Sequence, residues 1–218
     1  MTQSTLPQAS STGPSPRQTV VTLDLEGVLV PEIWIAVADR TGIDALRRTT
    51  RDEPDYDVLM QYRLGVLEEH SLTMTLIAEV ISGLAPEPGA REFLDALRAR
   101  TQVIILSDTF EQFAAPLMVH LGMPTVFCHR LLVADDRIVG YQLRQPDQKR
   151  HAVLAFQGLN YKVIAAGDSY NDTSMLAVAE RGVLFRSPAK VQAEFPQFTA
   201  VDEYEDLMSI ILDELQGV

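Results

Sequence analysis

The chain has 218 residues, a hydrophobic fraction of 46% and a formal net charge of −12 at pH 7. These values suit one globular domain, or a domain with an insert, that has enough apolar residues for a sizeable core. The negative charge argues against nucleic acid or an anionic membrane as a partner, because both bind through clustered positive charge. A small phosphate substrate stays compatible, because a few local cations or a metal can reverse the field inside one cleft.

The N-terminal segment and the cysteine content bear on location. Residues 1–18 are rich in Ser, Thr, Pro and Gln and lack the pattern of a secretory signal, so we expect a disordered tail. No stretch approaches the ~18 apolar residues that span a bilayer. The single cysteine, Cys128, cannot form an intramolecular disulfide, which fits a reducing compartment. We therefore expect a cytoplasmic protein, whose assembly stays open between a monomer and a homodimer.

Short apolar runs, nearly continuous rather than alternating, predict buried parallel strands. They are Val20–Leu25, Val103–Leu106, Val163–Ala166 and Gly182–Phe185, and Thr125–Cys128 predicts a further short strand. Helical patterns lie between them at Glu92–Arg100, Glu111–Leu121, His151–Leu159 and Asp172–Ala179. This alternation predicts an α/β fold with a Rossmann-like parallel sheet and right-handed crossovers.

Two segments interrupt the alternation. The segment between the first and second strands is far longer than one crossover needs, and its pattern predicts helices at Glu32–Thr41, Tyr56–Glu69 and Met74–Gly83. We therefore predict a helical cap domain, residues 32–86, inserted into a core domain of residues 19–31 and 87–218. The second segment, Arg130–Leu143, predicts a β-hairpin with its turn at Ala134–Asp136.

Carboxylates follow three of the predicted strands. The first strand ends in Asp24 and Glu26, the second in Asp108, and the third in Asp168 and Asp172. Ligands of an open parallel sheet bind at the carboxyl ends of its strands, so these acids should meet at one edge. A single acid there is commonly a helix N-cap, but three clusters at one edge repel one another and need a counter-charge. A hard divalent cation held by oxygen ligands meets that need.

Four motifs, in order between about residues 19 and 186, resemble those of the haloacid dehalogenase superfamily of phosphotransferases. They are DLEGVL from Asp24, ILSDT with Ser107, PDQKRHAV with Lys149, and GDSYND with Asp168 and Asp172. The resemblance implies that Asp24 is the nucleophile, which forms an aspartyl phosphate, and that Glu26 moves the proton of the leaving and accepting groups. It implies Mg²⁺ as the cofactor, held by Asp24, the Glu26 backbone carbonyl and Asp168, with Asp172 acting through water.

The resemblance also implies the phosphate contacts. Ser107 and backbone N–H groups of the Gly27 loop would hold the phosphoryl oxygens, with Asp108 and Asn171 beside them in the substrate site. Lys149 would add positive charge that matters most in the transition state. The superfamily usually has Asp where this chain has Glu26, and the extra methylene of reach favours an acceptor other than water.

Longer stretches resemble the phosphoserine phosphatase branch of that superfamily. They are VPEIWIAVADRTGI after the first motif and YDVLMQYRLGVLEE in the predicted cap. The nearest likeness is to bacterial members that also transfer the phosphoryl group to homoserine. The resemblance implies O-phospho-L-serine as the substrate and water or homoserine as the acceptor. It implies that Glu32 meets the substrate ammonium and that Arg63 binds the carboxylate, with Arg51 as a second candidate.

Two other interpretations stay open. The chain could be a phosphatase for another small phosphomonoester, in which case Glu32 and Arg63 would be solvated helix charges. It could also be a catalytically silent binding module, because fold does not fix function. The intact set of Asp24, Ser107, Lys149 and Asp168 counts against a silent module, which needs no such set. The histidines show no metal-ligand spacing, which favours surface or packing roles for His70, His120, His129 and His151.

Overall fold

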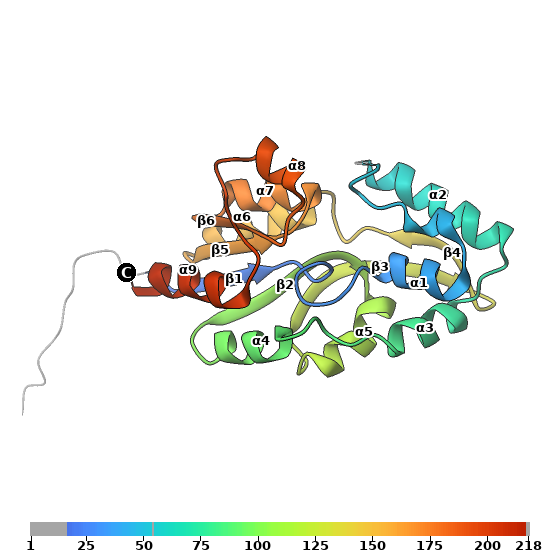
Figure 1. The fold of residues 1–218 in the computed structure, drawn as a ribbon, viewed down its shortest axis with the longest axis horizontal. Helices are drawn as coiled ribbons and strands as arrows, with labels where there is room; N and C mark the ends of the chain where they lie inside the picture. The colour runs from blue at the N-terminus through green and yellow to red at the C-terminus, as the bar shows by residue number, and fades with distance from the viewer. Residues whose placement is uncertain (1–16, 54, 217–218) are drawn as a thin grey trace, which may run out of the picture.

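A computed structural model describes residues 17–53 and 55–216, which form a seven-stranded sheet with helices on both faces (Figure 1). The strand order is β4-β3-β2-β1-β5-β6-β7, and every pair is parallel except β3 with β4. The strands are β1 (Thr19–Leu23), β2 (Gln102–Phe110), β3 (Thr125–Ala134), β4 (Arg137–Gln142), β5 (Lys162–Gly167), β6 (Arg181–Phe185) and β7 (Thr199–Val201). The predicted α/β fold with a Rossmann-like parallel sheet is confirmed. The predicted tail, residues 1–18, lies outside the described residues apart from its last two.

Helices cover the sheet in two layers, as Figure 1 shows. One layer contains α4 (Ala90–Arg98), α5 (Glu111–His120) and α9 (Tyr204–Gln216), and the other contains α6 (Gln148–Gly158), α7 (Thr173–Val178) and α8 (Ala189–Glu194). Each layer forms its own apolar cluster with the sheet, around Phe113 on one side and Val153 on the other. Because both faces are covered, all five residues of β1 are buried, which explains its continuous apolar sequence.

The segment between β1 and α4 forms the three predicted helices, α1 (Ile33–Thr41), α2 (Tyr56–Glu69) and α3 (Met74–Ser82). It also forms a short 3₁₀ helix, η1 (Asp44–Arg47), which was not predicted. Asp55 caps α2, because its side chain accepts hydrogen bonds from the N–H groups of Asp57 and Val58. Trp34 of α1 packs edge-on against Phe113 of α5, with 5.5 Å between the ring centroids. The segment therefore shares one apolar cluster with the sheet, and its division into a cap domain at 32–86 stays a prediction.

The β3–β4 hairpin lies at the same end of the molecule as α2 and α3 (Figure 1). Its turn contains two residues, Asp135 and Asp136, both with positive φ, as a type I′ turn requires. Asp136 accepts hydrogen bonds from the backbone N–H and the hydroxyl of Thr75, which fastens the hairpin to the start of α3.

Several predicted bounds differ from the structure. The predicted strand Thr125–Cys128 and the first arm of the hairpin are one strand, β3, which pairs with β2 and then with β4. The helices α8 and α9 and the strand β7 were not predicted. Within the described ranges, no helix is long and apolar enough to cross a bilayer.

Candidate active site

Asp24 lies directly after β1, where the chain order of the sheet reverses, between the ends of β2 and β5. Its backbone N–H donates to the Ala166 carbonyl (3.0 Å), which continues the pairing of β1 with β5 by one residue. Its side chain is buried, and Oδ1 accepts from the N–H of Leu25 (2.7 Å). The backbone of two strands thus fixes this carboxylate at the position where open parallel sheets bind ligands.

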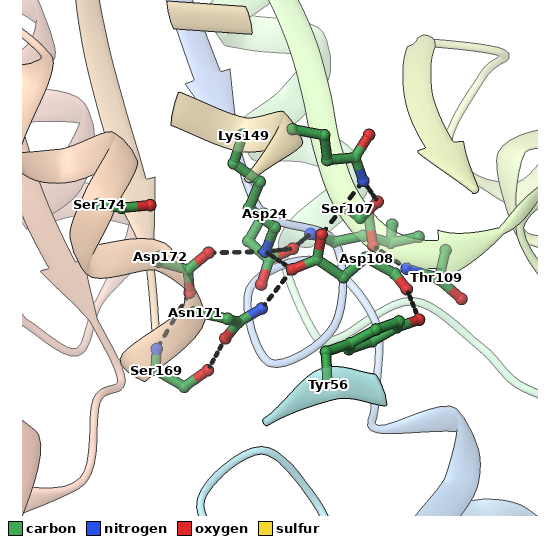
Figure 2. A network of polar contacts seen from close by, with 12 residues as sticks. Asp24, Tyr56, Ser107, Asp108, Thr109, Lys149, Ser169, Asn171, Asp172 and Ser174 are labelled. Atoms are coloured by element: carbon green, nitrogen blue, oxygen red, sulfur yellow. Dashed lines mark hydrogen bonds and ion pairs between the residues drawn. The ribbon is translucent and has the colours of Figure 1, made fainter. Parts of the chain in front are cut away.

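Lys149 lies in the first turn of α6, because that helix begins at Gln148 rather than at the predicted His151. Its side chain is only 2% exposed. Figure 2 shows its Nζ among three carboxylates, 2.9 Å from Asp24 Oδ1, 2.7 Å from Asp172 Oδ1 and 3.6 Å from Asp108 Oδ2. Burial lowers the pKa of Lys149, but these acids raise it further, to well above its ordinary value. The ammonium therefore stays charged and is the counter-charge of all three carboxylates.

Asp24, Asp168 and Asp172 form a cluster of carboxylate oxygens that all lie within 4.8 Å of one another. Asp172 is held by the N–H groups of Asp168 (2.9 Å) and Ser169 (3.0 Å). Burial, then Asp172, raises the pKa of Asp168 to about 7 against the opposing charge of Arg51. Burial and the neighbouring acids also raise the pKa of Asp24 well above its ordinary value. This donor set fits a hard divalent cation, which would relieve the repulsion between the carboxylates.

Gly27 allows the first motif to approach this cluster. Its φ is +78°, and a Cβ at this position would lie 2.7 Å from Asp168 Cγ. A side chain here would therefore collide with one of the clustered acids. The Gly27 N–H donates to the Val30 carbonyl (2.8 Å), and the contact of the Gly27-loop N–H groups with phosphoryl oxygens stays a prediction.

A cavity of about 60 Å³ opens beside Asp24. Among the predicted site residues it is lined by Asp24, Glu26, Glu32, Arg63, Ser107, Asp108, Asp168 and Asn171. Lys149 and Asp172 are buried next to Asp24, and Arg51 contacts Asp168 from the segment before α2. The sequence therefore identified residues from five segments that the fold brings to one place, although their roles stay predictions.

Glu26 of the first motif is half-buried beside the start of α1. Its Oε2 accepts from the N–H of Ile33 (2.9 Å), at the N-terminus of that helix. Burial raises the pKa of Glu26, and the hydrogen bonds from Ile33 and Thr109 oppose the rise. A raised pKa favours the protonated form of the carboxyl, which is the form that a general acid requires.

Glu32 and Arg63 lie on the side of the cavity formed by the helical segment. Burial, then the charge of Glu26, raises the pKa of Glu32 to about 7. Arg63 is only 6% exposed, with its guanidinium 4.8 Å above the Trp34 ring. Its Nη2 donates to the Arg48 carbonyl (2.9 Å), while its Nε has no partner within the described part of the chain. The alternative that Arg63 is a solvated helix charge is wrong.

The sequence did not single out Tyr56, which joins the helical segment to the end of β2. Its hydroxyl donates to the Asp108 carbonyl (2.6 Å) from the first turn of α2 (Figure 2). The Asp108 carboxylate accepts from the Asn171 amide (2.9 Å), and Asn171 accepts from the Ser169 hydroxyl (2.5 Å). These contacts tie α2, β2 and the loop after β5 together around the cavity.

Comparisons with known proteins agree with this geometry. Residues 19–180 match the family described as haloacid dehalogenase-like hydrolase. The chain is 63% identical to phosphoserine phosphatase ThrH of Pseudomonas aeruginosa, over 86% of this chain and 92% of that protein. It is 60% identical to a phosphoserine phosphatase of Pseudomonas syringae pv. tomato, over 86% and 80%. A solved phospho-aspartyl intermediate analogue of phosphoserine phosphatase shares the fold, with a TM-score of 0.74 at 18% identity over 89% of this chain and 99% of that one.

Proposed function

Because this chain belongs to the haloacid dehalogenase-like hydrolase family, we propose that it is a Mg²⁺-dependent enzyme that moves the phosphoryl group of O-phospho-L-serine to water or to homoserine. The observation that carries the proposal is one cavity lined by both kinds of residue. Asp24, which belongs to the acidic cluster, and Glu26 line it together with Glu32 and Arg63. The names of the two relatives at 63% and 60% identity support phosphoserine as the substrate.

In the first step an Asp24 oxygen attacks phosphorus, and the bond from phosphorus to the serine oxygen breaks as the new bond forms. Glu26 donates its proton to the departing serine oxygen, a role that its raised pKa supports. Lys149 holds Asp24 by a contact of 2.9 Å and supplies positive charge beside the transferred group. Mg²⁺ bound by Asp24, Asp168 and the Glu26 carbonyl, with Asp172 in support, would offset the charge of the phosphoryl oxygens.

In the second step the ionised Glu26 takes a proton from water or from the homoserine hydroxyl, whose oxygen attacks the phosphorus of the aspartyl phosphate. The bond to Asp24 breaks, so the carboxylate is restored and the product is inorganic phosphate or O-phosphohomoserine. Ser107, buried at the cavity wall, would hold phosphoryl oxygens in both steps. The two steps are mirror images, so one carboxyl serves as acid and then as base.

Recognition of the amino-acid part falls to the other side of the cavity. Glu32 would bind the ammonium, and the buried Arg63 would bind the carboxylate, for which a guanidinium fork is suited. Arg51 contacts Asp168 and lies 3.5 Å from Glu32, so it is the second candidate for the carboxylate. A cytoplasmic location is part of the proposal and is supported by the buried, unpaired Cys128. A homodimer stays an open prediction.

The test incubates purified protein with Mg²⁺ and O-phospho-L-serine, with and without homoserine, and measures phosphate and phosphohomoserine together. Phosphohomoserine formed at the expense of phosphate is the expected result. Phosphate release that homoserine leaves unchanged would restrict the enzyme to hydrolysis. The absence of both products would refute phosphoserine as the substrate. The Asp24→Asn variant is the control for contaminating phosphatases, since it should fold and show no turnover.

A further inference from the structure

A buried polar network lies behind Asp108, on β3 and α6 rather than in the helical segment that faces the substrate. His129 of β3 is 4% exposed. Its ring lies 5.8 Å from the Tyr56 ring and 6.4 Å from the Phe110 ring, measured between centroids. A surface role, one of the two the sequence favoured for this histidine, is therefore wrong, and packing alone does not describe its polar contacts.

The hydrogen bonds of His129 fix which nitrogen carries the proton. Nδ1 accepts from the backbone N–H of Arg144 (3.1 Å), so it has no proton of its own. The neutral ring then carries its proton on Nε2. Nε2 lies 3.3 Å from the Gln148 amide nitrogen and 3.5 Å from Asp108 Oδ1. The amide nitrogen is itself a donor, so the Asp108 carboxylate is the acceptor for this proton.

Asp108 connects His129 to the residues at the phosphoryl position. Its Oδ1 also accepts from the Gln148 amide (3.2 Å), while Oδ2 accepts from Asn171 (2.9 Å) and lies 3.6 Å from Lys149 Nζ. Burial raises the pKa of Asp108, but Lys149, His129, Asn171 and Gln148 together hold it well below its usual range. One oxygen thus faces the buried network and the other faces the cavity.

We propose that His129 is a positioning residue, which orients the Asp108 carboxylate so that Asp108 keeps the Lys149 ammonium and the Asn171 amide in place for phosphoryl transfer. The inference rests on the proposed function. Without the His129 donor, Asp108 can turn about its side-chain bonds, and its Oδ2 leaves Asn171 and Lys149. Lys149 then has only Asp24 and Asp172 as close partners and shifts away from the transferred group.

The proposal predicts that loss of the His129 donor lowers kcat and leaves KM nearly unchanged. Glu32 and Arg63, which bind the amino-acid part in the proposed function, have no hydrogen bond to His129 or Asp108 in the described structure, so KM should change little. A misplaced ammonium lowers the rate of phosphoryl transfer, by about tenfold or more for a displacement approaching 1 Å. A loss of packing alone would instead lower the melting temperature without this selective loss of kcat.

The test compares His129→Phe, which keeps a ring and removes the donor, with His129→Gln, whose amide nitrogen reaches the position of Nε2. Tyr141→Phe is the matched control, because Tyr141 also lies in the hairpin beside Phe110 while its hydroxyl bonds to Asp57, outside the network. For O-phospho-L-serine we expect kcat to fall about tenfold in His129→Phe and KM to stay within about twofold. His129→Gln should regain most of the rate, and Tyr141→Phe should match the unmodified protein.

An unchanged kcat in His129→Phe would overturn the inference, as would equal losses in His129→Phe and His129→Gln. If His129→Phe does not fold, His129→Asn replaces it, because the asparagine nitrogen reaches only the position of Nδ1. His129→Asn should then be slower than His129→Gln, and equal rates would again overturn the inference. Failure of the unmodified protein to release phosphate from phosphoserine would refute the proposed function instead, so the two failures are distinguishable.

Discussion

Replacing Lys149 by methionine should destabilise the protein strongly when no metal is bound. Methionine has a similar length and can occupy the buried volume, so the change mainly removes the charge. Asp24 and Asp172 would lose partners at 2.9 Å and 2.7 Å, and Asp108 a partner at 3.6 Å. Asp24 and Asp172 would remain buried, and Asp108 partly buried, without their common counter-charge.

The expected magnitude follows from burial. Removing one partner of a buried ion pair costs about 3–5 kcal/mol, because it leaves an uncompensated charge. Lys149 is 2% exposed, so solvent screens these contacts little. For a chain of this size, each kcal/mol lowers the melting temperature by roughly 2–4 °C, which gives a decrease of about 6–20 °C.

The free energy of unfolding should be measured in urea with a chelator present, so that Lys149 alone supplies the counter-charge. Lys162→Met is the matched control. Its Nζ lies 2.6 Å from Glu214, but the two side chains are 17% and 31% exposed, so we expect a loss of only about 1 kcal/mol. A Lys149→Met protein that is as stable as the control variant would refute the reasoning, because the three acids would then not depend on this ammonium.

Three further changes probe the proposed substrate contacts. With a pKa of about 7, Glu32 is mostly charged only above neutral pH, so KM for phosphoserine should fall as the pH rises from 6 to 8. Glu32→Gln should remove this pH dependence, and a variant that keeps it would contradict the ammonium contact. Arg63→Ala should raise KM for phosphoserine about tenfold or more but leave phosphoethanolamine, which lacks the carboxylate, nearly unaffected; equal effects on both would exclude carboxylate binding. Glu26→Asp should change the ratio of phosphohomoserine to phosphate. An unchanged ratio would refute the idea that the longer reach of Glu26 favours an acceptor other than water.

The sequence predicted the acids of the site because strand ends are local signals. Asp24 and Asp168 directly follow β1 and β5, whose sequences are mostly apolar, and parallel pairing places such ends at one edge. The burial of Lys149 has no such signal, since α6 begins before the residue where the apolar pattern starts. Lys149 was identified by resemblance to the superfamily motif instead.

Contacts between distant residues account for what the sequence did not predict. Tyr56 and Asp108 lie 52 positions apart, and no periodicity relates a helix start to the end of a strand.

β7 was not predicted because it has only three residues, two of them exposed, and thus no apolar run. Tyr204 of α9 donates to the Val28 carbonyl (2.5 Å) and stacks on Phe185, so the C-terminal helix also supports the loop after β1.

The charge balance of the cavity explains how an acidic protein can bind an anionic substrate. The carboxylates at this edge outnumber the nearby cations Lys149, Arg51 and Arg63. Burial, and then the neighbouring acids, raise the pKa values of Asp24 and Asp168. Protonation would relieve the repulsion but would also remove the nucleophile. In the proposed function a divalent cation would relieve it and leave Asp24 ionised. The acidic cluster that repels phosphate on its own would then, with Mg²⁺, attract it.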